Sequence, residues 1–174
     1  MKIIAFAGST SSTSINKQLA TYASELLKNA TYEVLDMNDY QMPLYSIDAE
    51  KDGFPDAVDQ LNAKFKSADG FIVSLAEHNG SYAAAYKNTI DWLSRVERNM
   101  FNDKPMLLMA TSPGGRGGAG VLGAAKLYYP HAGAKIVADF SLPKFYDNFV
   151  DGKLTNEELN AALTEKVQVL ENSL

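Results

Sequence analysis

Short apolar segments alternate with longer amphipathic segments along the whole chain, and this order leaves few folds open. The apolar segments are short enough for buried strands and occupy residues 2–7, 32–36, 70–75, 105–111 and 134–142. The amphipathic segments have helical length and periodicity and occupy residues 14–29, 55–66, 83–98, 118–131 and 156–172. The chain is therefore predicted to repeat a β-strand and an α-helix five times.

The last amphipathic segment carries a helix start signal. Thr155, followed three positions later by Glu158, matches a capping box, in which each side chain bonds the backbone N–H of the other residue. The apolar residues that then share one helical face are Leu159, Leu163, Val167 and Leu170. These signals predict a helix that begins directly after Thr155.

Continuous apolar strands that alternate with helices indicate a parallel sheet covered on both faces. Right-handed crossovers place helices on each side of such a sheet, which predicts a three-layer α/β sandwich. Five strands fit the doubly wound, flavodoxin-like order 2-1-3-4-5, in which ligands bind at the carboxyl ends of the strands near the switch point. The 174 residues are expected to form one domain spanning residues 1–174.

Composition excludes several classes of protein. Cysteine is absent, which excludes disulfide scaffolds, thiolate metal sites and Cys nucleophiles. His78 and His131 lack the spacing of metal ligands, so no metal is expected. The 16 Lys and Arg against 21 Asp and Glu give a net charge of −5, which disfavours nucleic acid as a partner. The first apolar segment is too short for a signal peptide or a membrane span, so we expect a cytoplasmic protein.

The loop after the first predicted strand is rich in hydroxyl groups. Six consecutive Ser and Thr residues, 9–14, lead into a helix. A helix N-terminus offers unpaired N–H groups and a partial positive charge, and with these hydroxyls it can bind a phosphate dianion. Helix capping alone needs only one or two such residues, so phosphate binding is favoured. The Walker pattern is absent, so a magnesium nucleotide is not indicated.

The segment after the third predicted strand, residues 76–82, is a polar turn. Backbone groups of such a turn can meet the edge of a flat heterocycle, and His78 or Tyr82 can lie against its face. A plain turn before an amphipathic helix explains the same residues equally well.

The segment after the fourth predicted strand, residues 111–120, is rich in glycine, which lets the backbone approach a ligand closely. Gly115, Gly117 and Gly120 also match the GxGxxG pattern, with Asp139 following 19 residues later. This pattern raises the alternative of a dinucleotide-binding module without redox activity. The alternative ranks second, because it leaves the hydroxyl-rich first loop without a purpose.

The three loops together resemble those of the NADPH-dependent FMN reductase family, which has a flavodoxin-like fold. The similar segments are GSTSSTSINKQLA at residues 8–20, MPLYSIDAE at 42–50, AEHNGSYAAAYKNTIDWLSR at 76–95 and SPGGRGG at 112–118. The resemblance implies FMN and NADPH or NADH as cofactors. It also implies hydride transfer from nicotinamide to bound FMN and then to a small acceptor such as a quinone, flavin, azo dye or metal oxyanion. Because the flavin carries this chemistry, no catalytic side chain is expected.

The resemblance also assigns cofactor-binding residues. In the first loop, those expected at the FMN phosphate are Ser9, Ser11, Ser14, Ile15 and Asn16. In the second loop, those expected at the isoalloxazine ring are Ala76, Glu77, His78 and Asn79. In the third loop, those expected at the pyrimidine side are Ser112, Pro113, Gly114 and Gly115.

Three residues depart from the family pattern. Ser11 replaces an Arg, which removes a charge-assisted phosphate contact and predicts weaker FMN binding, with Lys17 a candidate replacement. Ala76 and His78 replace Pro and Tyr at the ring. Family members pair through helices near the flavin, which implies a homodimer or homotetramer, with residues 87–92 at the interface. Tyr45 is expected either there or as a lid over the flavin.

One further alternative comes from the fold. A flavodoxin-type electron carrier would share the architecture and the cofactor but would dock through a strongly acidic surface. A net charge of −5 and the family motifs disfavour it.

Overall fold

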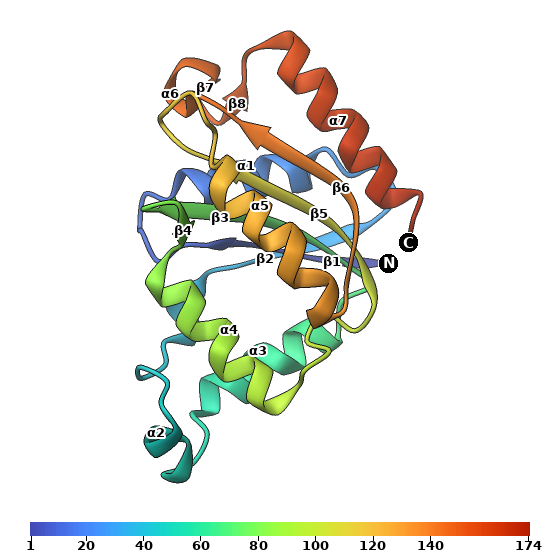
Figure 1. Cartoon of the computed structure of the whole chain (residues 1–174). Helices are drawn as coiled ribbons and strands as arrows, with labels where there is room; N and C mark the ends of the chain where they lie inside the picture. The colour runs from blue at the N-terminus through green and yellow to red at the C-terminus, as the bar shows by residue number, and fades with distance from the viewer.

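The computed structural model describes residues 1–174 and contains a central, mostly parallel sheet with helices on both faces (Figure 1). The strands of this sheet are β1 (Lys2–Gly8), β2 (Thr31–Leu35), β3 (Gly70–His78), β4 (Ser81–Tyr82), β5 (Lys104–Thr111) and β6 (Ala134–Leu142). The parallel strands follow the order β2-β1-β3-β5-β6, which confirms the predicted order 2-1-3-4-5. A separate hairpin pairs β7 (Phe149–Val150) with β8 (Lys153–Leu154).

The sheet has six strands rather than the predicted five, because β3 turns back on itself. β4 pairs antiparallel with the end of β3, with Glu77 opposite Tyr82. The turn consists of Asn79 and Gly80, which both have positive φ, at 52° and 78°. Asn-Gly is the residue pair that favours such two-residue hairpins, so the sequence did contain the signal for β4.

Helices cover both faces of the sheet, as predicted for a three-layer sandwich (Figure 1). They are α1 (Ile15–Glu25), α2 (Ile47–Lys51), α3 (Asp56–Lys66), α4 (Ala84–Val96), α5 (Ala119–Tyr128), α6 (Phe145–Asn148) and α7 (Glu157–Glu171), with 3₁₀ helices at Met37–Tyr40 and Tyr129–Ala132. α1 and α7 pack on one face and α3, α4 and α5 on the other. Neighbouring residues of β1 alternate between the two cores, since Ile3 faces α1 while Ile4 faces α3.

The start of α7 differs from the predicted capping box. Asn156, not Thr155, is the N-cap, and its side chain accepts a hydrogen bond from the N–H of Leu159 at 3.1 Å. Thr155 instead donates its N–H and its hydroxyl to the carbonyl of Asn148. The capping-box prediction is therefore wrong, because Thr155 bonds the residue before β7 at the open end of the β7–β8 hairpin, and Asn caps a helix equally well.

The carboxyl ends of β1, β3 and β5 meet at one edge of the sheet, on the side of the molecule opposite the two termini (Figure 1). This geometry brings the three loops from the sequence analysis to the same place. None of the helices is long and apolar enough to cross a membrane.

Candidate functional site

A cavity of about 340 Å³ lies where the three loops meet, and we call it the loop cavity. Its lining residues are Ser9, Ser11, Thr13, Ser14, Ile15, Asn16, Ala76, Glu77, His78, Thr111, Ser112, Pro113 and Tyr146. Ten of the thirteen residues expected from the sequence to bind the cofactor are among them. The other three, Asn79, Gly114 and Gly115, lie in the same loops but outside the lining.

Hydroxyl groups of the first loop organise the loop and cap α1. The Ser14 hydroxyl accepts the N–H of Lys17 at 3.1 Å, and the Ser11 hydroxyl accepts the N–H of Thr13 at 3.3 Å. The N–H groups of Ile15 and Asn16 have no acceptor within the protein. They lie at the positive end of the helix dipole, so the loop presents free donors to an anion.

Asn16 is buried, and its side chain joins three elements. Its Oδ1 accepts hydrogen bonds from the Ser74 hydroxyl on β3 at 2.8 Å and from the Thr111 N–H on β5 at 3.0 Å. Its Nδ2 donates to the Thr111 carbonyl at 3.2 Å. The Asn16 side chain therefore holds α1 against the strand ends, and its backbone N–H is the group left free for a ligand.

No Lys or Arg lines the loop cavity. Lys17, the candidate replacement for the family Arg, forms an ion pair with Asp36 after β2. This ion pair, together with the Asn38 N–H, holds the pKa of Asp36 below its usual range. An anion in the cavity would therefore be held by hydrogen bonds and the helix dipole rather than by a paired cation.

Glu77 connects the second loop to α5. Its Oε2 accepts the N–H of Val121, in the first turn of α5, at 2.9 Å. A Cβ at Gly120 would lie 2.8 Å from the same oxygen, so glycine leaves room for the carboxylate. A carboxylate at a helix N-terminus is favoured by the helix dipole. Glu77 therefore fixes the second loop relative to the third.

The glycines of the third loop fall into two groups. Gly117 and Gly118 have positive φ. A Cβ on Gly117 would overlap Ser141 Oγ, and a Cβ on Gly118 would lie 2.8 Å from the Ala110 Cβ. Gly114 and Gly115 have open space around them, with only Ser112 Oγ within 4 Å of a Cβ on Gly114. Internal packing thus explains two glycines of the GxGxxG match, Gly117 and Gly120, without a dinucleotide.

Tyr146 lines the loop cavity and was not found from the sequence. It belongs to α6, a short helix that follows β6 and begins after Lys144, whose φ is positive. The sequence shows no periodicity over four residues, so nothing indicated a helix there. The position of Tyr146 depends on where β6 ends in the assembled sheet.

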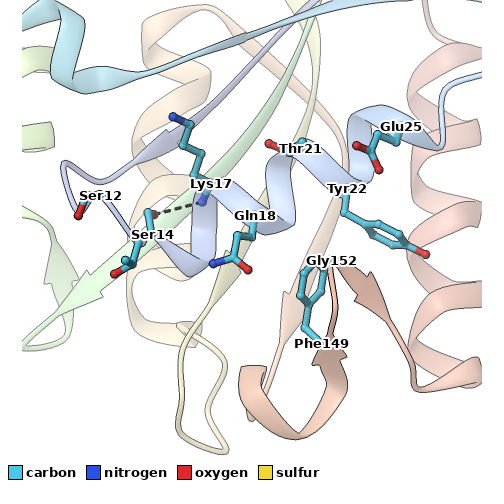
Figure 2. A pocket seen from close by; sticks show the side chains of 10 residues that line it. Ser12, Ser14, Lys17, Gln18, Thr21, Tyr22, Glu25, Phe149 and Gly152 are labelled. Carbon is cyan, nitrogen blue, oxygen red and sulfur yellow. Dashed lines mark hydrogen bonds between the residues drawn. The ribbon is translucent and has the colours of Figure 1, made fainter.

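A second groove, of about 330 Å³, runs along α1 toward the β7–β8 hairpin (Figure 2). It contacts the first loop at Ser12, Thr13 and Ser14, but the rest of its lining comes from the side of α1 and from Phe149 and Gly152. Neither the second nor the third loop reaches it. The loop cavity is therefore the site that combines the predicted phosphate-binding and ring-binding segments.

The segment between β2 and α3 is fixed to α4 outside the loop cavity. Trp92 is fully buried and donates its Nε1–H to the Pro43 carbonyl at 2.8 Å. Tyr45 packs edge-on against Trp92, with ring centroids 5.2 Å apart, and donates its hydroxyl to Glu50 at 2.8 Å. Hydrogen bonds from Tyr45 and Arg95 hold the pKa of Glu50 below its usual range. Tyr45 does not line the loop cavity.

Comparison with known proteins shows which family this chain resembles. A family model described as NADPH-dependent FMN reductase matches residues 1–147. An NAD(P)H-dependent FMN reductase of Pseudomonas aeruginosa is 32% identical over 130 residues, which cover 74% of this chain and 66% of that protein. A quinone reductase of Escherichia coli is 39% identical over 79 residues, which cover 45% of this chain and 42% of that protein. The chain thus spans less than two-thirds of the length of these relatives.

A solved structure agrees over nearly the whole chain. FerB, a flavoenzyme NAD(P)H:(acceptor) oxidoreductase from Paracoccus denitrificans, has a TM-score of 0.75 and 26% identity, and the match covers 99% of this chain and 98% of that one. Neither the dinucleotide module nor the electron carrier is favoured by these similarities. The chain therefore belongs to the NADPH-dependent FMN reductase family.

Proposed function

We propose that this protein is an NAD(P)H-dependent FMN reductase that binds FMN in the loop cavity and reduces a small acceptor such as a quinone, flavin, azo dye or metal oxyanion. The observation that carries the proposal is the joint lining of one cavity by three loops from the carboxyl ends of β1, β3 and β5. Doubly wound sheets bind their ligands at this place. Membership of the family supports FMN and NAD(P)H as the cofactors.

The first loop fits a phosphate. The N–H groups of Ile15 and Asn16 and the hydroxyls of Ser9, Ser11 and Ser14 offer donors at a helix N-terminus. Because no cation lines the cavity, the loop lacks the stronger charge-assisted bond that the family Arg would give. We therefore expect FMN to dissociate more readily than from a site with that Arg.

The second and third loops fit a flat ring. The strand end and turn at Ala76, Glu77, His78 and Asn79 offer backbone groups, and Glu77 holds this turn against α5. Ser112 of the third loop lines the same cavity, and the open space around Gly114 and Gly115 in that loop allows close approach of a ligand. His78 is exposed, so a ring placed there keeps one face accessible.

When bound, FMN supplies the redox chemistry, since it takes a hydride from reduced nicotinamide and passes electrons to an acceptor. The chain's own residues bind the phosphate, orient the ring and leave one side open. One shared open side requires nicotinamide and acceptor to bind in turn, which predicts ping-pong kinetics.

The oligomeric state is also part of the proposal. The segment between β2 and α3 carries two strongly exposed apolar side chains, Leu44 at 83% and Ile47 at 69%. It projects from the layered body together with α2 (Figure 1). Adjacent exposed apolar side chains of this kind are typical of a protein interface. We propose that this segment and α4 join copies of the chain into a homodimer or homotetramer.

Anaerobic mixing of the protein with FMN and NADPH tests the proposed function. We expect the visible absorption of FMN to bleach at a rate that depends on the protein and to return when a quinone is added. A reaction no faster than without protein would contradict the proposal. Accumulation of a stable one-electron-reduced flavin would instead favour the electron carrier.

A further inference from the structure

The loop cavity offers little apolar surface for the tricyclic ring proposed to bind there. Most of its lining side chains are hydroxyls, amides or small residues, and its apolar members Ile15, Ala76 and Pro113 have no aromatic ring. Besides the imidazole of His78, Tyr146 is the one aromatic ring in the lining. Flat heterocycles are held mainly by apolar and aromatic contacts. Tyr146 is therefore the largest surface available to such a ring.

The backbone that carries Tyr146 is fixed to the third loop. The N–H of Lys144 donates to the Gly114 carbonyl at 3.0 Å, and the N–H of Phe145 donates to the Ser112 carbonyl at 3.1 Å. Phe145 is 2% exposed and stacks on Phe149, with ring centroids 4.8 Å apart. Hydrogen bonds thus fix the start of α6 to the segment expected at the pyrimidine side of the flavin.

The Tyr146 ring itself is free for a partner. Tyr146 is 67% exposed, although its neighbour Phe145 is buried, and the two rings pack edge-on with centroids 5.5 Å apart. No hydrogen bond holds its hydroxyl within the protein. An exposed aromatic side chain on a rigid backbone at the wall of a binding cavity gains contact area when a flat ligand enters.

We infer that Tyr146 is a cofactor-binding residue whose ring packs against the isoalloxazine ring. This inference rests on the proposed function. The contact is to the ring and not to the phosphate, so it contributes equally to the binding of FMN and of riboflavin. It also depends on the aromatic ring and not on the hydroxyl, so phenylalanine replaces tyrosine without loss.

Flavin titrations of Tyr146→Ala and Tyr146→Phe test the inference, with Tyr32→Ala as the control. Tyr32 is 43% exposed on β2 and does not line the loop cavity. We expect Tyr146→Ala to raise the dissociation constants of FMN and riboflavin alike, by about tenfold, from the usual strength of an aromatic contact. The dissociation constants of Tyr146→Phe and Tyr32→Ala should stay within about twofold of those of the unchanged protein.

Chemical protection gives a second readout that needs no variant. Nitration of the unchanged protein with tetranitromethane, mapped by mass spectrometry, should modify Tyr146 and Tyr32 alike, and saturating FMN should protect Tyr146 only. Three results would each overturn the inference while the reductase proposal stands. The first is unchanged flavin affinity in Tyr146→Ala, and the second is an affinity loss for FMN but not for riboflavin. The third is nitration of Tyr146 that saturating FMN does not reduce. Failure of the unchanged protein to bind FMN would overturn both.

Discussion

Single residues at the loop cavity hold the protein together as well as face the proposed ligand, and Asn16 shows this most clearly. Its side chain makes three buried hydrogen bonds to β3 and β5. Asn16→Ala leaves those partners unpaired and should lower the free energy of unfolding by about 2–4 kcal/mol. Urea denaturation measures the change. Ser12→Ala, at an exposed residue of the same loop, is the control and should change stability little. Equal stability of the two variants would contradict the bracing role.

A variant at Ser14 distinguishes phosphate binding from ring binding. Its hydroxyl caps α1 by accepting the Lys17 N–H. Ser14→Ala should cost about 1 kcal/mol of stability, the usual contribution of an N-cap. It should also weaken FMN about tenfold through lost phosphate contacts, while riboflavin, which lacks the phosphate, binds as before. Calorimetric titration with both flavins measures this, and an equal loss for both would show that Ser14 does not act on the phosphate.

Tyr82 has a buried hydroxyl without a hydrogen-bond partner, and burial raises the pKa of this group to about 12. Its pKa in the unfolded chain is about 10, so titration of Tyr82 costs the fold no stability below that pH, and the free energy of unfolding falls progressively as the pH rises from about 10 to about 12. Tyr82→Phe should therefore make the alkaline loss of stability shallower. It should also raise the free energy of unfolding at pH 7 by about 1 kcal/mol, because an unpaired polar group leaves the interior. Thermal unfolding against pH tests both, and lower stability at pH 7 would mean that the hydroxyl has a partner.

At the scale of elements, the third loop combines glycines required by packing with glycines that are open. Gly117→Ala places a Cβ against Ser141 and Leu142 in a left-handed conformation and should cost about 2–3 kcal/mol of stability. Gly115→Ala has nothing within 4 Å of its Cβ and should leave stability unchanged. Denaturant unfolding of the pair checks this. A destabilised Gly115→Ala would mean that the open half of the loop is packed in solution.

The sequence predicts the repeated elements well and the short ones poorly. β6 spans the predicted residues 134–142, because a long apolar run between turn residues has few other solutions. The strand order follows from parallel pairing and right-handed crossovers, which are general rules. α6 and the strands β4, β7 and β8 were not predicted, because each contains too few residues to show periodicity. For β4, the Asn79-Gly80 pair was the one local signal. The start of α7 at Asn156 depends on a tertiary contact of Thr155 that local sequence does not reveal.

Part of the candidate site was also predictable from the sequence, and part was not. Residues carried by loops between predicted strands and helices, such as Ser9 and His78, do line the loop cavity. The bracing role of Asn16 and the contact of Glu77 with α5 join residues 95 and 44 positions apart, and only the folded chain shows them. Tyr146 reaches the cavity by way of α6 and was missed for the same reason.

At the scale of the whole molecule, the projecting segment between β2 and α3 predicts self-association. Leu44→Asp combined with Ile47→Asp places charges on the two most exposed apolar side chains of this segment. We expect the unchanged protein to sediment as a dimer or tetramer and the double variant to shift to a monomer. Both side chains are exposed in the single chain, so the fold should survive, which circular dichroism checks. A monomeric unchanged protein would contradict the proposed interface.

Equilibrium titration of the unchanged protein with FMN, followed by calorimetry and with NADP⁺ titrated in parallel, tests the central claim most directly. The loop cavity predicts saturable binding of one FMN per chain, with weaker binding of riboflavin because the first loop then holds no phosphate. NADP⁺ alone, without flavin, should bind at most weakly. Heat from NADP⁺ with none from FMN would contradict the account and assign the glycine-rich third loop to a dinucleotide.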